Sequence, residues 1–165
     1  MRRLALFCVV VLLAVPARAQ DDEQTRATLR GLKGVRIVVE DLSPALSDRG
    51  ITTNVVLAEV QLPLRQAAIP IDDDSGRRPL PGDPVLNVQV LASVDERFDQ
   101  CAFAVRLELR QNTQLERDHG MAVSATTWST GGLGEAGKDW RQVLREELAY
   151  YAGVFVEAWQ AANNP

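Results

Sequence analysis

The chain has 165 residues and a formal net charge of −4, from 18 Lys and Arg against 22 Asp and Glu. This length allows a single domain. An acidic balance lacks the positive surface that nucleic acids and anionic membranes attract, so we expect no nucleic-acid partner.

The first 19 residues have the pattern of a secretory signal peptide. Arg2 and Arg3 precede an apolar run from Leu4 to Val15, and Ala17-Arg18-Ala19 matches an A-x-A cleavage site. A retained N-terminal anchor is the alternative. Cleavage removes three arginines and no acids, which leaves a more acidic chain. No later segment is apolar and long enough to span a bilayer. We therefore expect an exported protein without a transmembrane segment after cleavage. It would be periplasmic if the source has an outer membrane, and otherwise secreted.

The chain after the signal is predicted to hold one flexible segment and one domain. Residues 20–33 are polar and begin with three acids, which favours a frayed tail with at most a short helical turn. Residues 34–163 are predicted to form a single α/β domain. Cys101 is the only cysteine left, so no internal disulfide can form, and the fold must depend on its apolar core.

The first elements of this domain are a strand and a helix. Residues 34–40 (GVRIVVE) alternate and are rich in β-branched side chains, which predicts a strand that ends before Pro44. Thr52 is a candidate N-cap for a helix. Its apolar stripe consists of Val56, Leu57, Val60 and Leu64. Pro63 predicts a kink or an early end of this helix.

A short edge strand and a polar loop follow. Residues 68–71 (AIPI) suit an edge strand, where Pro is tolerated. The loop from Asp72 to Asp83 contains the run Asp72-Asp73-Asp74. This run lacks the alternating ligands and closing glutamate of a calcium loop, so we predict a solvated loop and no metal site.

Three further strands and a long helix complete the domain. Residues 84–94 form one predicted strand, residues 101–115 a second with clear period-two alternation, and residues 121–130 a third after a turn at 116–120. Helical spacing predicts a last helix over residues 138–162. Its stripe comprises Trp140, Leu144, Leu148, Tyr151, Phe155 and Trp159. The predicted fold is α/β (α+β): a mostly antiparallel sheet of four to five strands, with two helices packed on one face and a long C-terminal helix.

Catalytic groups are scarce. His119 is the only histidine and lies in the predicted turn, while Cys101 begins a strand. If the strands around that turn pair as a hairpin, these two residues start at opposite ends of it, which argues against a Cys-His pair. No pair of carboxylates stands out as a general acid and base. We predict no catalytic residue and no cofactor.

The segment from Trp128 to Gly134 is the candidate contact site for a ligand or partner. It offers Trp128, Ser129, Thr130, Gly131, Gly132 and Gly134 just before the last helix. Glycine-rich turns before helices can bind anions. However, the lysine and hydroxyl of a phosphate loop do not follow, and the segment is not a G-x-S-x-G elbow. A flexible connection between strand and helix is the other interpretation.

Four stretches carry a family resemblance: VRIVVEDL, VQLPLRQAAIPI, VRLELRQ and ATTWSTGGLG. Over residues 31–163 the chain resembles a family of small exported bacterial proteins of unassigned function. In that family a glycine usually stands at the position of Ala68, and Pro63 also departs from the pattern. In element order alone, the chain is similar to the N-terminal domain of the Tol-system periplasmic propeller protein, a likeness that does not license a function.

Three functions remain open from the sequence. The first is a non-catalytic binding or assembly module of the bacterial cell envelope with a protein partner. The second is a small-ligand binder that uses residues 128–134. The third is a hydrolase-type enzyme.

Overall fold

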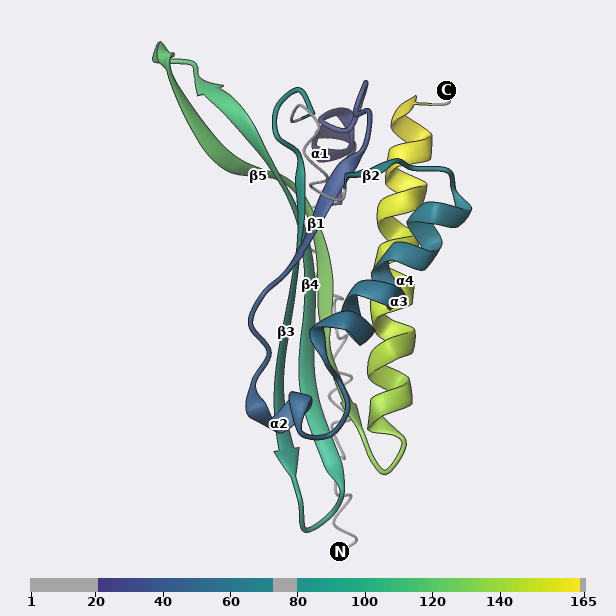
Figure 1. Cartoon of the computed structure of the whole chain (residues 1–165). Helices are drawn as coiled ribbons and strands as arrows, with labels where there is room; N and C mark the ends of the chain where they lie inside the picture. Colours follow the sequence, from purple (N-terminus) through teal and green to yellow (C-terminus); the bar gives the residue numbers. More distant parts are fainter. Residues whose placement is uncertain (1–20, 73–79, 164–165) are drawn as a thin grey trace, which may run out of the picture.

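The computed structural model describes residues 21–72 and 80–163. These residues form an α+β fold with a five-stranded sheet and four helices (Figure 1). The elements follow in the order α1 (Glu23–Ala27), β1 (Val35–Val39), α2 (Pro44–Ser47), α3 (Thr53–Gln66), β2 (Ile71–Asp72), β3 (Val85–Asp95), β4 (Gln100–Leu115), β5 (Asp118–Ala136) and α4 (Trp140–Asn163).

The sheet is mixed, which corrects the prediction of a mostly antiparallel one. The strand order is β2-β1-β3-β4-β5, and β1 pairs in parallel with both of its neighbours. Parallel neighbours need a crossover connection, and α3 supplies it between β1 and β2. Period-two alternation gives the faces of a strand but not the direction of its partner. The sequence therefore could not distinguish these two pairings from antiparallel ones.

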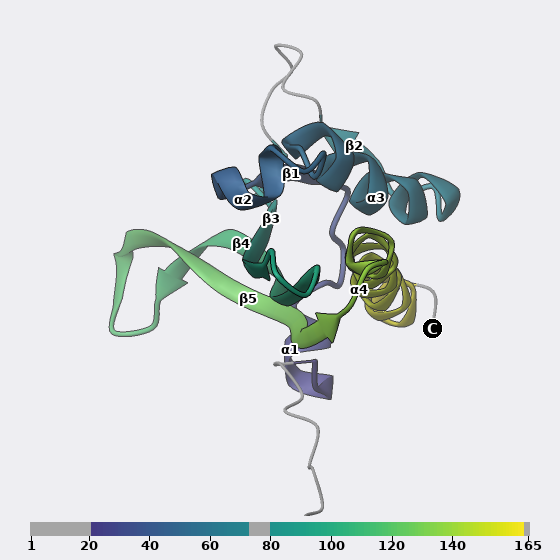
Figure 2. The ribbon, with the colours of Figure 1, turned by 90° about the horizontal axis from the view of Figure 1, so that it is seen from below.

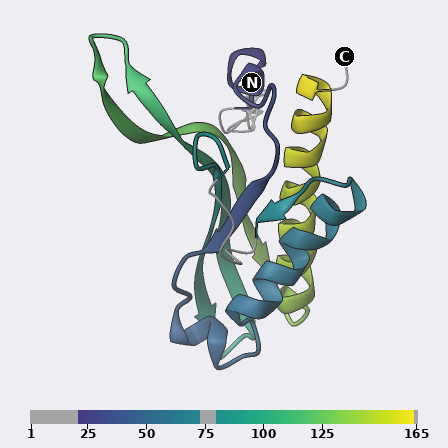
Figure 3. The same ribbon diagram turned by 45° about the horizontal axis from the view of Figure 1, so that its top comes forward.

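Strands β3, β4 and β5 form an antiparallel meander that is longer than the rest of the sheet. The far ends of β4 and β5 project beyond the helices as a two-stranded arm (Figures 1 and 3). We call residues 110–127 the hairpin arm. None of its side chains is fully buried. The turn at its tip consists of Glu116 and Arg117, so β5 begins at Asp118, within the predicted turn.

Helix α3 begins where the sequence predicts. The Thr52 side chain accepts a hydrogen bond from the Val55 backbone N–H at 3.4 Å, as an N-cap does. Three residues of its apolar stripe, Val56, Val60 and Leu64, are buried. The predicted early end at Pro63 is wrong, because α3 continues to Gln66.

Helix α4 buries one stripe of apolar residues and lies against α3. Arg145 donates a hydrogen bond to Glu59 of α3 at 2.6 Å. In Figures 1 and 2 the two helices run next to each other on the same side of the sheet. We call the sheet face toward them the inner face and the opposite one the outer face. The stripe residues fully buried on α4 are Trp140, Leu144, Leu148, Ala152, Phe155 and Ala158.

The segment before β1 differs from the predicted flexible tail. Leu29 and Leu32 are buried in the core. The backbone around them is bonded to the end of α4: Asn163 Nδ2 donates to the Leu29 carbonyl at 3.0 Å, and Trp159 Nε1 donates to the Leu32 carbonyl at 3.1 Å. The packed domain therefore includes residues before Gly34. Two isolated leucines in a polar stretch were too weak a pattern to show this.

Candidate functional site

Trp128, the only large side chain of the predicted contact segment, lies inside the core. It is fully buried, and its ring meets Phe155 of α4 edge-on, with centroids 5.2 Å apart and planes at 67°. Its indole Nε1 donates a hydrogen bond to Asp21 Oδ1 at 3.0 Å. Trp128 is therefore a core residue in this structure, and a ligand could reach its ring only if the core opened.

A β-bulge at Thr127 explains the inward direction of Trp128. Leu109 pairs with Trp128 and Arg110 pairs with Thr126, so Thr127 has no partner across the ladder. An extra residue of this kind switches the alternation of the bulged strand. Regular alternation over residues 121–130 would place Trp128 on the same side as Thr126, but Thr126 is exposed and Trp128 is buried. The Thr28 hydroxyl donates to the Thr127 carbonyl at 3.2 Å and fixes the bulge.

The glycines of the segment belong to β5, and they do not form a loop before α4. Gly131, Gly132 and Gly134 pair with Arg106, Val105 and Phe103 of β4. The strand continues to Ala136, and α4 starts at Trp140. The structure therefore places these glycines in a strand, where the sequence suggested a turn or a connection directly before the last helix.

Close packing is the physical reason for these glycines. A Cβ at Gly134 would lie 2.5 Å from the Phe103 ring, and one at Gly132 would lie 2.2 Å from the Tyr151 hydroxyl. At Gly131 a Cβ would lie 2.3 Å from the Val105 carbonyl oxygen. Real Cβ atoms do not approach other atoms this closely, so a larger residue at any of these positions would force its neighbour to move.

The two hydroxyl residues of the segment lie between the glycines and Trp128. Thr130 pairs with Leu107, and Ser129 pairs with Glu108; both are buried. The segment therefore contributes mainly to packing. Its exposed residue is Leu133, which was not among the predicted contact residues.

Cys101 and His119 lie at opposite ends of the β4–β5 hairpin. Cys101 pairs with Ala136 at one end, while His119 follows Asp118, the partner of Leu115, at the other. Leu115 lies fourteen residue steps after Cys101 along β4, which corresponds to about 46 Å. Burial also raises the pKa of the Cys101 thiol. The structure does not bring these two residues together, as the hairpin prediction implied.

The outer face of the sheet carries an exposed apolar row. Leu91 of β3, Ala104 of β4 and Leu133 of β5 are direct neighbours across three strands. Leu133 is 90 % exposed and Leu91 is 59 % exposed. We call these three residues the apolar row. A shallow hollow of about 650 Å³ lies over it, and its rim includes Ser93 and Glu135.

Polar groups occupy the outer face next to this row. Arg106 forms an ion pair with Glu108, with Nη2 and Oε1 2.7 Å apart. Further along, the Glu40 carboxylate accepts hydrogen bonds from Asn87 Nδ2 and Gln89 Nε2, both at 2.7 Å. These two bonds, that from Asn87 first, lower the pKa of the Glu40 carboxyl. The outer face thus has an apolar row at one end and bonded polar side chains at the other.

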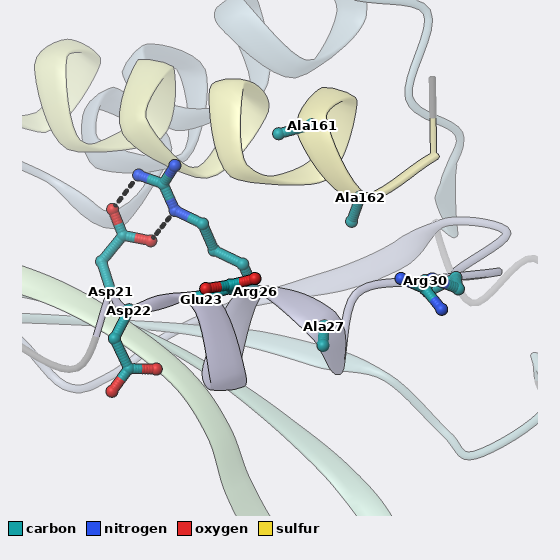
Figure 4. Close-up of a pocket in the computed structure, with 8 residues that line it drawn as sticks. All are labelled: Asp21, Asp22, Glu23, Arg26, Ala27, Arg30, Ala161 and Ala162. Carbon is teal, nitrogen blue, oxygen red and sulfur yellow. Dashed lines mark hydrogen bonds and ion pairs between the residues drawn. The ribbon is translucent and has the colours of Figure 1, made fainter. Parts of the chain in front are cut away.

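A second hollow, of about 600 Å³, lies between the segment that contains α1 and the end of α4 (Figure 4). Its main charged feature is a two-point contact: Arg26 Nε and Nη2 donate to the two Asp21 carboxylate oxygens at 2.6 and 2.5 Å. This contact raises the pKa of Arg26. Because Asp21 also accepts from Trp128, its carboxylate connects this segment to the core.

Metal-binding groups do not converge in the part of the chain that the structure describes, where no three His, Cys, Asp or Glu residues are grouped. The predicted solvated loop with the aspartate run lies largely outside the described residues, since only Asp72 of that run falls within them. No described helix is both long enough and apolar enough to cross a membrane.

No protein-family model matches this chain, and no curated protein matches it either.

Proposed function

We propose that the protein is an exported, non-catalytic binding or assembly module of the bacterial cell envelope, and that its partner protein docks on the outer face at the apolar row. The observation that carries this proposal is the 90 % exposure of Leu133, in one row across the sheet with Ala104 and the exposed Leu91. Burial of one leucine side chain contributes about 1.5–3 kcal/mol, so a partner that covers both gains a sizeable part of a binding free energy.

The arrangement around the apolar row supports a protein partner. Contiguous exposed apolar groups rimmed by polar ones are typical of protein interaction sites. Here the exposed, oppositely charged Arg106 and Glu135 lie on the same face as the row, two residues from Ala104 and from Leu133 respectively. We infer that α3 and α4 together form one helical layer on the inner face. Under this arrangement the outer face is the one that a partner can use.

Export is the second half of the proposal and rests on the pattern of the first 19 residues. Cell fractionation followed by mass spectrometry of the N-terminus tests it. We expect the mature chain outside the cytoplasm, beginning at Gln20. A chain that retains Met1 or residues 2–19 and stays in the cytoplasm would refute export while leaving the docking surface to be tested on its own.

Site-specific photo-cross-linking in intact cells tests the docking surface. A photoreactive amino acid at Leu133 should give a reproducible cross-linked protein. The same probe at Glu146, an exposed residue of α4, should not give that product. A second probe at Leu91 should capture the same protein, because both leucines belong to the apolar row. Equal products from Leu133 and Glu146, or none from either leucine, would overturn the proposed docking surface.

A further inference from the structure

The open edge of β5 is the feature that points beyond a general docking surface. β5 is the last strand of the sheet, and within the described ranges it pairs with β4 alone. Edge strands usually resist pairing with other chains through Lys, Pro or a bulge. Residues 129–136 contain no Lys and no Pro, and the bulge lies before them at Thr127. This part of the edge is therefore a template for another strand.

We propose that a second copy of this chain pairs with it antiparallel along β5, about a two-fold axis at Leu133. This pairing extends the proposed function, since it brings two apolar rows together. Leu133 of each copy would face Leu133 of the other on the outer face. Because each Leu133 already adjoins Ala104, which in turn adjoins Leu91, the row would run without a break across six strands.

Charge complementarity favours this register. With the axis at Leu133, Glu135 of one copy lies opposite Gly131 of the other. Within one copy Gly131 pairs with Arg106 of β4. Because Gly131 has no side chain, nothing lies between this Arg106 and Glu135 of the other copy. Arg106 and Glu135 are both exposed. The two-fold axis repeats the contact, so the dimer would hold two such ion pairs.

Neighbouring registers are less favourable. An axis at Gly132 would put Glu135 opposite Ser129, whose β4 partner is the acid Glu108. An axis at Gly134 would oppose Leu133 with Glu135.

Two further registers fail for other reasons. An axis at Glu135 would oppose two glutamates, and like charges directly opposite destabilise a strand pair. An axis at Gly131 would place Glu135 against the bulged Thr127, whose carbonyl already accepts from Thr28. The axis at Leu133 is the one that combines apolar contact with opposite charges.

The helical side of the molecule is compatible with this axis. α4 contacts both β4 and β5, so in the dimer the two α4 helices would lie on the same side of the joined sheet. Arg145 points toward α3, where it meets Glu59. Five residues later the helix has turned by about 140°, so Tyr150 points away from α3.

Tyr150 therefore lies at the level of the proposed axis. It is 63 % exposed and packs edge-on against Tyr151, whose hydroxyl lies beside Gly132. In the dimer the Tyr150 side chains of the two copies approach each other. Pairing of about eight residues is a small interface, below the usual 1,600 Å² or so, so we expect a weak dimer.

A symmetric cysteine tests the pairing and its register. Directly opposite residues in antiparallel strands have Cβ atoms about 4.5–5.5 Å apart, close to disulfide range. Leu133→Cys should therefore form a disulfide-linked dimer on mild oxidation of the purified, exported form of the protein. Glu135→Cys is the matched control, because the two copies of residue 135 lie on opposite sides of the axis and should not cross-link. The native Cys101 has a free thiol that is buried, and its strand position pairs with Ala136 inside the sheet.

Charge reversal provides an independent readout, by sedimentation velocity over a range of concentrations. Arg106→Glu and Glu135→Arg should each raise the dimer Kd, by about 2- to 30-fold for two exposed ion pairs. The double variant should restore wild-type dimerisation. Within one chain Arg106 pairs with Gly131, four residues before Glu135, so the two charges do not meet there. Recovery of dimerisation in the double variant is therefore predicted only by the contact between copies. A single cooperative thermal transition would show that each variant is folded, although Arg106→Glu also removes the ion pair with Glu108.

Three outcomes would overturn the inference. They are equal disulfide yields from Leu133→Cys and Glu135→Cys, a double variant that does not recover, and a wild-type protein that stays monomeric while a foreign protein cross-links to Leu133 in cells. The last result removes the self-pairing and leaves the proposed function intact. If the probes at Leu133 and Leu91 both captured only a second copy of this chain, that result would remove the proposed partner protein and leave the self-pairing intact.

Discussion

The Tyr151 hydroxyl fills the space in which a side chain at Gly132 would begin. A Cβ at Gly132 would lie 2.2 Å from that oxygen. The contact joins α4 to the inner face of β5 in the middle of the segment that the sequence marked as a candidate site. The glycine at this position thus meets a packing requirement between helix and sheet.

Gly132→Ala should destabilise the protein by about 1–3 kcal/mol, because Tyr151 must move away and α4 with it. Gly153→Ala is the matched control. Gly153 lies within α4, and an added Cβ there meets nothing within 4 Å. That change should be neutral or stabilise by up to about 1 kcal/mol through helix propensity. Urea unfolding of both variants measures the difference, and equal midpoints would contradict the packing role.

Ala68→Gly should stabilise the protein by about 0.5–1 kcal/mol. Ala68 follows α3 with φ = 56°, a left-handed conformation that costs energy for any residue with a Cβ. The backbone bonds Ala68 N to Arg65 O at 3.0 Å and Ile69 N to Leu64 O at 2.9 Å form a Schellman cap, which favours glycine at this place.

Ala58→Gly is the control for this prediction, since Ala58 is an exposed residue inside α3. The same chemical change should there destabilise by about 1 kcal/mol. Thermal unfolding of the two variants should therefore shift in opposite directions. Shifts of the same sign would mean that the conformation at Ala68 is not strained.

Leu29→Ala tests whether the segment before β1 belongs to the domain. Leu29 is fully buried, so its truncation should cost about 2–5 kcal/mol. Leu62→Ala removes the same group from a side chain that is 54 % exposed, and we expect a much smaller loss. Chemical denaturation measures both. Equal and small losses of stability in the two variants would indicate that residues 20–33 form a flexible tail.

The hydrogen-bonded Glu40 predicts a pH dependence of stability. The bonds from Asn87 and Gln89 lower its pKa in the folded state below the ordinary value of 4.5. A lowered folded-state pKa contributes stability that is complete above about pH 4.5 and is lost as the pH falls through the folded-state value.

The free energy of unfolding of wild type and Glu40→Gln should therefore converge as the pH falls below 4.5. An NMR titration of the Glu40 carboxyl gives a direct check, in which Asn87→Ala should move its pKa upward. A Glu40 pKa at or above 4.5 in the wild type would show that these bonds do not favour the carboxylate.

Local patterns predicted the elements better than their assembly. The Thr52 cap, the stripe of α3, the alternation of β4 and the span of α4 follow from neighbouring residues, and the structure confirms them. The direction of β1 relative to β3 depends on residues far apart in the chain. No local pattern contains that information.

The candidate site shows the same limit at the level of single residues. One extra residue, Thr127, turns Trp128 from the surface into the core. The glycines that suggested a loop are explained by Phe103 and Tyr151, which approach them from a neighbouring strand and from α4. Leu133 drew no attention in the sequence, since a single leucine between glycines is a weak pattern. Its exposure became visible only with the sheet.

The parallel pairing of β1 with β3 has a consequence for the order of folding. The meander and α4 are contiguous in sequence, so their contacts are local and can form quickly. β1 instead pairs with β3, which is synthesised only after α3, β2 and the following loop. During synthesis the N-terminal half therefore emerges without the strand that completes it. A chain arranged in this way completes its sheet late, which would fit the export that we propose.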